Sequence, residues 1–139
     1  MRAKENITIH APIDVVWRTL TEIGQWPRWQ RAVGQVSVQG SLAPSTEFRW
    51  TSGGLKIHSR IQEVNAPFSI RWLGSALGTK ADHSWTLSSA GTGTEVTTVE
   101  SMSGWLVSLM GLFNKQFLAN SLKQTLTDLK EESESRHAA

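Results

Sequence analysis

The sequence predicts an α+β fold in which a curved antiparallel sheet of about seven strands wraps around one long C-terminal helix. Three stretches carry this prediction. Residues 12–24 place apolar side chains at helical spacing, residues 33–102 alternate with a period of two between turns, and residues 105–133 contain no proline. The 139 residues fit one domain, 1–139, with one sizeable core.

The first strand is expected at residues 3–10, and two short helices follow it. Pro12 stands where a helix tolerates proline, and Asp14 then lies in the first turn, favourably for the helix dipole. The apolar positions Ile13, Val16, Trp17 and Leu20 form one buried face. This helix ends near Gly24, and a second short helix is expected at Trp26-Pro-Arg-Trp29.

The middle of the chain reads as six further strands separated by short turns. On the fifth strand, Phe68, Ile70 and Trp72 are expected to share one face. The glycines at 53–54 and in the loop 74–78 are the candidate hinges of a gate, since glycine permits hinge motion. The expected strands are residues 33–38, 47–51, 55–64, 68–72, 81–88 and 94–102.

The last helix is expected to run unbroken from 105 to about 133, with residues 133–139 as a frayed tail. Its first half, WLVSLMGLF (105–113), is apolar almost all round. The stretch is too short to span a membrane, which takes ~20 residues. Docking on a membrane or partner stays open, but a sheet with an apolar face needs a cover, so we expect this segment in the core.

The amino-acid composition excludes several kinds of functional site and partner. The chain has no cysteine, which excludes disulfides, thiolate zinc sites and cysteine nucleophiles. The four histidines show no paired metal-ligand spacing, and no phosphate-binding loop opens a helix, so no metal or cofactor is expected. A net charge of +2 indicates no nucleic-acid partner. The N-terminus lacks a signal peptide, so we expect a cytoplasmic protein without integral membrane association.

Seven tryptophans, four phenylalanines and no tyrosine give the chain aromatic mass without phenol hydroxyls. Trp17 fits the core face of the first helix, while Trp26 and Trp29 are expected to pin the short helices over one end of a cavity. Three further tryptophans fall on the concave face of their strands. They either pack against the long helix or line a flat slot for an apolar or aromatic ligand.

One polar pair is expected on the concave face. If the last hairpin turns near Gly91, Leu87 lies opposite Val96 and Trp85 opposite Thr98, so His83 faces Glu100. Such a pair is a polar handle for a ligand, an acid/base couple or a structural pair, and a register slip of one residue would turn Glu100 outward. The candidate ligand-binding residues are Trp50, Ile57, Ser59, Trp72, His83, Trp85, Thr98 and Glu100.

Ser59 is the polar residue on the concave face of its strand, and with His83 and Glu100 it invites comparison with a hydrolase triad. We do not predict one, because no G-x-S-x-G elbow is present and the three residues lie within different strands.

Three motifs together resemble the START-like, or SRPBCC, superfamily in its polyketide cyclase/dehydrase-like branch. They are the API-x-VW-x-x-L helix with WPRW, the turn within IQEVNAPFSIRW, and the closing hairpin HSWTL…GTGTEVTTVES…GW at 83–105. They cover nearly the whole chain in the family's order. The resemblance implies a helix-grip (START/Bet v 1-like) fold with a deep cavity between the sheet and the C-terminal helix.

Members of this superfamily include lipid carriers, hormone receptors, cyclases and co-chaperone-like proteins, so the fold leaves the function open. The preferred hypothesis is the binding of a hydrophobic or aromatic small molecule in the cavity. The first alternative is a polyketide cyclase, aromatase or dehydratase in which His83 and Glu100 transfer protons. The second is a protein-interaction module that uses an exposed face. Whether the protein is an enzyme, and its oligomeric state, stay open.

Overall fold

The computed structural model describes residues 1–110 and 115–139, and a seven-stranded antiparallel sheet dominates the described part. Its spatial order is β1-β7-β6-β5-β4-β3-β2, so the first and last strands in sequence are neighbours. The strands are β1 (Arg2–Ile9), β2 (Val33–Gln39), β3 (Glu47–Ser52), β4 (Leu55–Asn65), β5 (Ser69–Ala76), β6 (Thr79–Ala90) and β7 (Gly93–Ser103).

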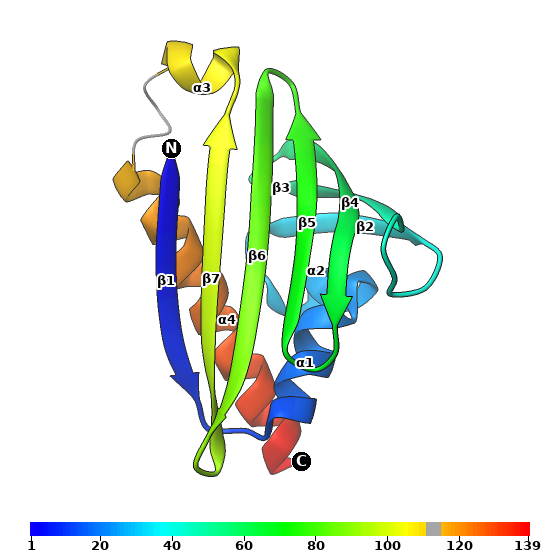
Figure 1. Cartoon of the computed structure of the whole chain (residues 1–139), viewed down its shortest axis with the longest axis vertical. Coiled ribbons are helices and arrows are strands. Elements are labelled where there is room, and N and C mark those ends of the chain that lie inside the picture. Colours follow the sequence, from blue (N-terminus) through cyan, green and yellow to red (C-terminus); the bar gives the residue numbers. More distant parts are fainter. Residues whose placement is uncertain (111–114) are drawn as a thin grey trace.

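Helices α1, α2 and α4 lie on one face of this sheet, and α3 lies beyond the strand ends (Figure 1). In that view β1, β7, β6 and β5 stand upright while β2 and β3 cross behind them, so the sheet curls toward α4. We call the face toward the helices concave and the opposite face convex. The helical segments are α1 (Ile13–Thr21), the short 3₁₀ turn η1 (Ile23–Gln25), α2 (Trp26–Trp29), α3 (Trp105–Met110) and α4 (Lys115–Ala138).

The expected first helix is confirmed. α1 follows Pro12, whose extended backbone (φ −62°, ψ 153°) makes it the residue before the helix, and Asp14 lies in the first turn. Val16, Trp17 and Leu20 are buried, as their spacing predicts. The WPRW segment forms α2, with proline at its start and Trp26 and Trp29 buried.

The expected register of the last hairpin is also confirmed. β6 and β7 pair so that Leu87 faces Val96, Trp85 faces Thr98 and His83 faces Glu100. Because side chains alternate between the two faces of a strand, this register places all three pairs on the concave face with the buried core.

The C-terminal helix differs from the prediction. The described residues of this region form two helices, α3 and α4. The prediction of one unbroken helix includes residues 111–114, which lie outside the described residues. The tail is helical to Ala138 instead of frayed from 133. Ion pairs explain this, because Arg136 contacts both Glu22, which precedes the 3₁₀ turn, and Glu132 one helical turn back.

Three smaller expectations are wrong. Phe68 does not share the buried face of β5; it lies in the turn before that strand and is half exposed. The loop expected at 74–78 is largely strand, since β5 runs to Ala76 and β6 starts at Thr79. The apolar start of the last helix does not lie wholly in the core, because Trp105 and Leu109 are exposed.

Candidate functional site

The eight residues that the sequence analysis singled out lie on one face of the sheet, in a row from β3 to β7. Trp50 pairs with Ile57 across β3 and β4, and Trp72 pairs with His83 across β5 and β6. Phe48 connects the two halves of the row, because its ring lies 5.7 Å from that of Trp72. The register therefore brings together side chains from five strands.

An aromatic cluster forms the β3–β5 half of this row. Trp26 of α2 lies at its centre, with ring centroids 5.6 Å from Phe48, 5.2 Å from Trp50 and 5.6 Å from Trp72. Its indole nitrogen donates to the Leu20 carbonyl at 2.9 Å, which orients the ring. Sequence reasoning placed Trp26 near the cavity but missed its central position, since periodicity does not tell which strand a short helix covers.

Ser59 orients an aromatic wall. Its hydroxyl accepts a hydrogen bond from the Trp50 indole nitrogen at 3.0 Å, and the residue is buried. Ser59 is the polar side chain on the concave face of β4, and this hydrogen bond gives it a partner. The Ser59 hydroxyl therefore bonds an indole nitrogen and not the imidazole of His83 among the described hydrogen bonds.

His83 occupies the other half of the row, between two indoles. Its ring lies 5.1 Å from Trp72 and 5.1 Å from Trp85, and the residue is only 7% exposed. Its Nε2 lies 2.7 Å from the hydroxyl of Thr98, and its Nδ1 lies 3.4 Å from Oε2 of Glu100. The polar end of the candidate site is therefore a His83–Thr98–Glu100 network inside an aromatic wall.

The hydrogen bonds of Thr98 determine which nitrogen of His83 is free to exchange a proton. The Thr98 hydroxyl has one hydrogen, and it donates to the Ser84 carbonyl at 3.1 Å. Its contact with His83 is then satisfied when Nε2 carries a hydrogen and donates. Nδ1 is left as the nitrogen that gains or loses a proton, and it faces Glu100.

Burial lowers the pKa of His83 below its ordinary value, because the apolar surroundings disfavour the charged ring. The nearby carboxyls of Glu100 and Asp82 act in the opposite direction and raise the pKa. Asp82 itself points to the convex face, where hydrogen bonds from Arg71 at 2.8 Å lower its own pKa. Glu100 is thus the carboxylate that shares the concave face with His83.

The apolar core is divided near this network. The larger cluster of buried residues runs from α1 and α2 across the sheet and includes Trp72 and Trp85. A separate, smaller cluster joins Ala3 to Leu118 and Leu122 of α4. Since Ala3 pairs with Glu100, the polar network lies where the two described clusters meet.

One buried donor beside His83 has no partner. The indole nitrogen of Trp85 is buried and forms no hydrogen bond with any described residue. A buried N–H without an acceptor costs about 1–3 kcal/mol, so an acceptor atom brought by a ligand would be stabilising there.

The described residues also border open hollows. Trp50 and Ile57 line one of about 640 Å³ beside β2, β3 and β4. Another, of about 690 Å³, lies mainly over the convex face and has Ser59 in its lining. Trp72, His83, Trp85 and Thr98 are buried and Glu100 is partly buried, and these five residues line neither hollow. No helix in the described part of the chain is long and apolar enough to cross a membrane.

The family assignment agrees with this geometry. Residues 1–134 match the family described as polyketide cyclase / dehydrase and lipid transport, and the chain therefore belongs to that family. No curated protein sequence matches the chain.

Solved structures share the fold at low sequence identity. TTHA0849 from Thermus thermophilus is 14% identical with a TM-score of 0.82, over 98% of this chain and 99% of that one. The aromatase/cyclase ZhuI from Streptomyces sp. R1128 is 15% identical with a TM-score of 0.75, over 98% and 94%. Ara h 8.0201 is 12% identical with a TM-score of 0.77, over 97% and 98%. These likenesses establish the helix-grip fold.

Proposed function

We propose that this protein binds a hydrophobic or aromatic small molecule against the concave face of its sheet. The ligand's apolar body would contact the tryptophan-rich wall, and a polar group would meet His83 and Glu100. The observation that carries this proposal is a buried, hydrogen-bonded histidine beside an unpartnered indole N–H, within a surface that is otherwise aromatic.

The aromatic wall favours a flat or extended apolar ligand. Trp72 and Trp85 flank the His83 ring, so a guest near the histidine would contact indole faces over most of its surface. Small-molecule sites in proteins have this composition, with mostly apolar and aromatic walls and few placed polar groups. The division of the core at Glu100 supports the same location.

The polar end favours a ligand that carries a carbonyl, hydroxyl or acidic oxygen. The Trp85 N–H offers a donor, and the Nδ1 of His83 with Glu100 offers an exchangeable proton. An oxygen acceptor on the ligand would accept a hydrogen bond from the Trp85 N–H and would form another with Nδ1 of His83. The candidate residues Ile57, Ser59 and Thr98 would shape and orient this surface without holding charge.

A second candidate function is proton-transfer catalysis of the cyclase, aromatase or dehydratase type. One observation favours it: Thr98 holds Nε2 of His83, so that Nδ1 and Glu100 form the proton-exchanging side of the network. Enolisation and dehydration of a polyketide-like substrate need a positioned acid and base in a shaped site. The named aromatase/cyclase with the same fold is consistent with this chemistry.

The test is titration of the protein with the aromatic probe 8-anilinonaphthalene-1-sulfonate, followed by fluorescence. We expect saturable binding, and we expect His83→Ala to weaken it about tenfold, the loss of one charge-assisted hydrogen bond from the protonated ring to the sulfonate. Glu100→Ala should weaken it as well, because the Glu100 carboxylate raises the pKa of His83 and so favours the protonated ring. His58→Ala and Glu47→Ala are matched controls, since that pair lies exposed on the convex face at 2.7 Å. Equal weakening by both sets of variants would remove the concave face from the site.

A further inference from the structure

The two ends of the molecule differ in exposed apolar surface. At the end away from the C-terminus, the β5–β6 turn and α3 present Leu77, Trp105 and Leu109, which are 75%, 61% and 74% exposed. We call these three residues the apolar tip. Figure 1 shows α3 projecting at this end, while the C-terminus of α4 lies at the other. The sequence analysis predicted that residues 105–113 lie in the core, so covering the sheet does not explain why Trp105 and Leu109 are apolar.

The tip is fixed in place by a close contact between α3 and the β5–β6 turn. The Leu106 N–H donates to the Gly78 carbonyl at 3.0 Å. A side chain at Gly78, where φ is +65°, would come within 2.8 Å of the Trp105 ring. Only glycine permits both this backbone conformation and this approach, so the indole rests on the turn with most of its surface in solvent.

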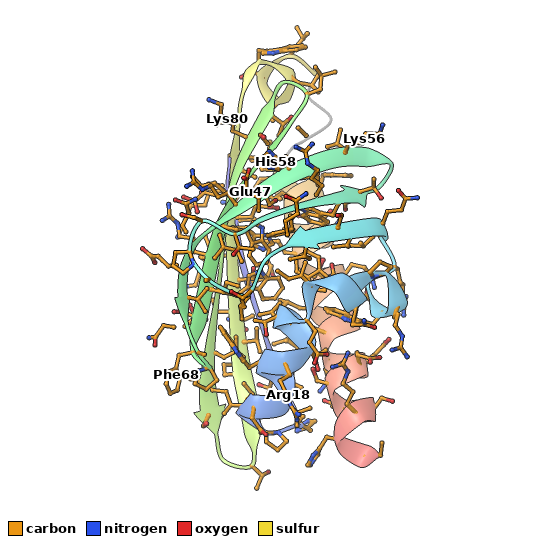
Figure 2. All side chains as sticks on the ribbon, turned by 90° about the vertical axis from the view of Figure 1, so that its right-hand side faces the viewer. Arg18, Glu47, Lys56, His58, Phe68 and Lys80 are labelled. Carbon is orange, nitrogen blue, oxygen red and sulfur yellow. The ribbon has the colours of Figure 1, made fainter. Side chains whose placement is uncertain are left out.

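Lysines without ion-pair partners among the described residues lie near the tip. Between residues 101 and 127 the charged side chains are Lys115 and Lys123, and the start of β6 adds Lys80. Lys56, near the start of β4, lies toward the same end (Figure 2). Among the ion pairs that join described residues, none involves these lysines.

The opposite end carries the acidic side chains of α4. Glu131, Glu132 and Glu134 lie in its last turns, near the C-terminus. These carboxylates are balanced by ion pairs with Arg31, Arg136 and Lys130, whereas the lysines near the tip have no such partner among the described residues. An isolated exposed leucine needs no explanation, but three large apolar side chains on one projecting, cationic end mark an interaction surface.

We propose that the apolar tip docks this protein on the surface of an anionic phospholipid bilayer. Tryptophan at the rim of an apolar surface is suited to the level of the lipid headgroups, where its ring is half apolar and half polar. Leu77 and Leu109 would enter the acyl boundary, and the lysines would attract the anionic headgroups. A second copy of the chain is a poorer occupant, because it would bring like charges together.

This proposal does not depend on the proposed ligand site, since none of the tip residues belongs to it. The experiment is co-sedimentation of the whole chain with vesicles, either of phosphatidylcholine alone or of phosphatidylcholine mixed with phosphatidylglycerol. We expect binding to the mixed vesicles, weaker at high salt, and little binding to the neutral ones. Leu77→Ser/Leu109→Ser should lower the bound-to-free ratio at least ~tenfold, and Lys80→Glu/Lys115→Glu should remove the preference for anionic vesicles.

Matched controls lie at the other end of the molecule, where Figure 2 shows Phe68 and Arg18. Phe68→Ser removes a half-exposed apolar side chain, and Arg18→Glu/Arg28→Glu reverses two exposed cations. Both should bind as the wild type does. The proposal is overturned if the wild type binds neither vesicle, or if the controls lose as much binding as the tip variants. It is also overturned if the wild type does not co-sediment with vesicles and sedimentation velocity shows a dimer that Leu77→Ser/Leu109→Ser abolishes.

Discussion

The sheet carries a histidine–carboxylate pair on each face, and the two pairs differ in their surroundings rather than in their chemistry. On the convex face, Nε2 of His58 lies 2.7 Å from Oε1 of Glu47, and these side chains are 40% and 52% exposed. On the concave face, Nδ1 of His83 lies 3.4 Å from Oε2 of Glu100, and the side-chain exposures are 9% and 19%.

Breaking the shorter contact, between His58 and Glu47, should cost less stability than breaking the contact between His83 and Glu100. Exposed ion pairs contribute about 0–1 kcal/mol, because water screens them and the side chains lose rotamer freedom. The inner pair lies among indole rings, where every change of protonation or hydrogen bonding costs more. Burial, and not the distance between the partners, marks the concave pair as the candidate site.

The largest expected difference is in packing, between the buried aromatic cluster and an exposed turn. Trp26→Ala should lower the free energy of unfolding by about 3–5 kcal/mol, because it leaves a cavity beneath Phe48, Trp50 and Trp72. Phe68→Ala, on a half-exposed ring, should change it by about 0.5 kcal/mol or less. Urea denaturation measures both, and similar losses would contradict the assignment of Trp26 to the centre of the cluster.

The second difference concerns hydrogen bonds. Thr98→Val keeps the shape of the side chain but leaves Nε2 of His83 buried without its partner, which should cost about 1–3 kcal/mol of stability. The neighbouring Thr97→Val, on the convex face, should stay within about 0.5 kcal/mol of the wild type. If both variants unfold at the same urea concentration, Thr98 does not hold the histidine.

The third difference concerns the unpartnered indole. Trp85→Phe removes the N–H and keeps an aromatic ring, so we expect affinity for the anilinonaphthalene probe to fall by about 1 kcal/mol, roughly fivefold. Trp105→Phe changes the same group at the exposed tip and should leave that affinity unaltered. Loss of probe binding in the second variant alone would place the probe at the tip.

The smallest difference concerns pH. Since burial lowers the pKa of His83 below its ordinary 6.5, the unfolded chain takes up a proton first as the pH falls. Its contribution to stability is complete above pH 6.5, declines below it, and levels off beneath the folded-state pKa. His83→Gln should remove this decline and His58→Gln should retain it, as thermal unfolding at a series of pH values would show.

The sequence was sufficient for the last hairpin and for the strand faces apart from that of Phe68. Alternation fixes which side chains share a face, and the turn at Gly91 fixes the register that joins His83 to Glu100. It was not sufficient for contacts between elements far apart in the chain. The position of Trp26 under β3–β5 depends on where a four-residue helix lies against a curved sheet.

The C-terminal region shows the other limit. Hydrophobic periodicity indicates that a segment is apolar, but it does not say whether the apolar side chains meet the protein or another surface. Trp105 and Leu109 were predicted as core on their composition, and they are exposed because α3 begins beyond the strand ends, on the β5–β6 turn. The helical tail was missed because its ion pairs join residues distant in sequence, such as Arg136 and Glu22.

The most direct test of the ligand site is a proton–nitrogen correlation spectrum of the seven tryptophan indoles, recorded during titration with the anilinonaphthalene probe. We predict that the Trp72 and Trp85 resonances move most, with the Trp85 N–H moving toward lower field as it gains an acceptor. The Trp105 resonance should stay in place. A spectrum in which Trp105 moves while Trp72 and Trp85 do not would contradict the account.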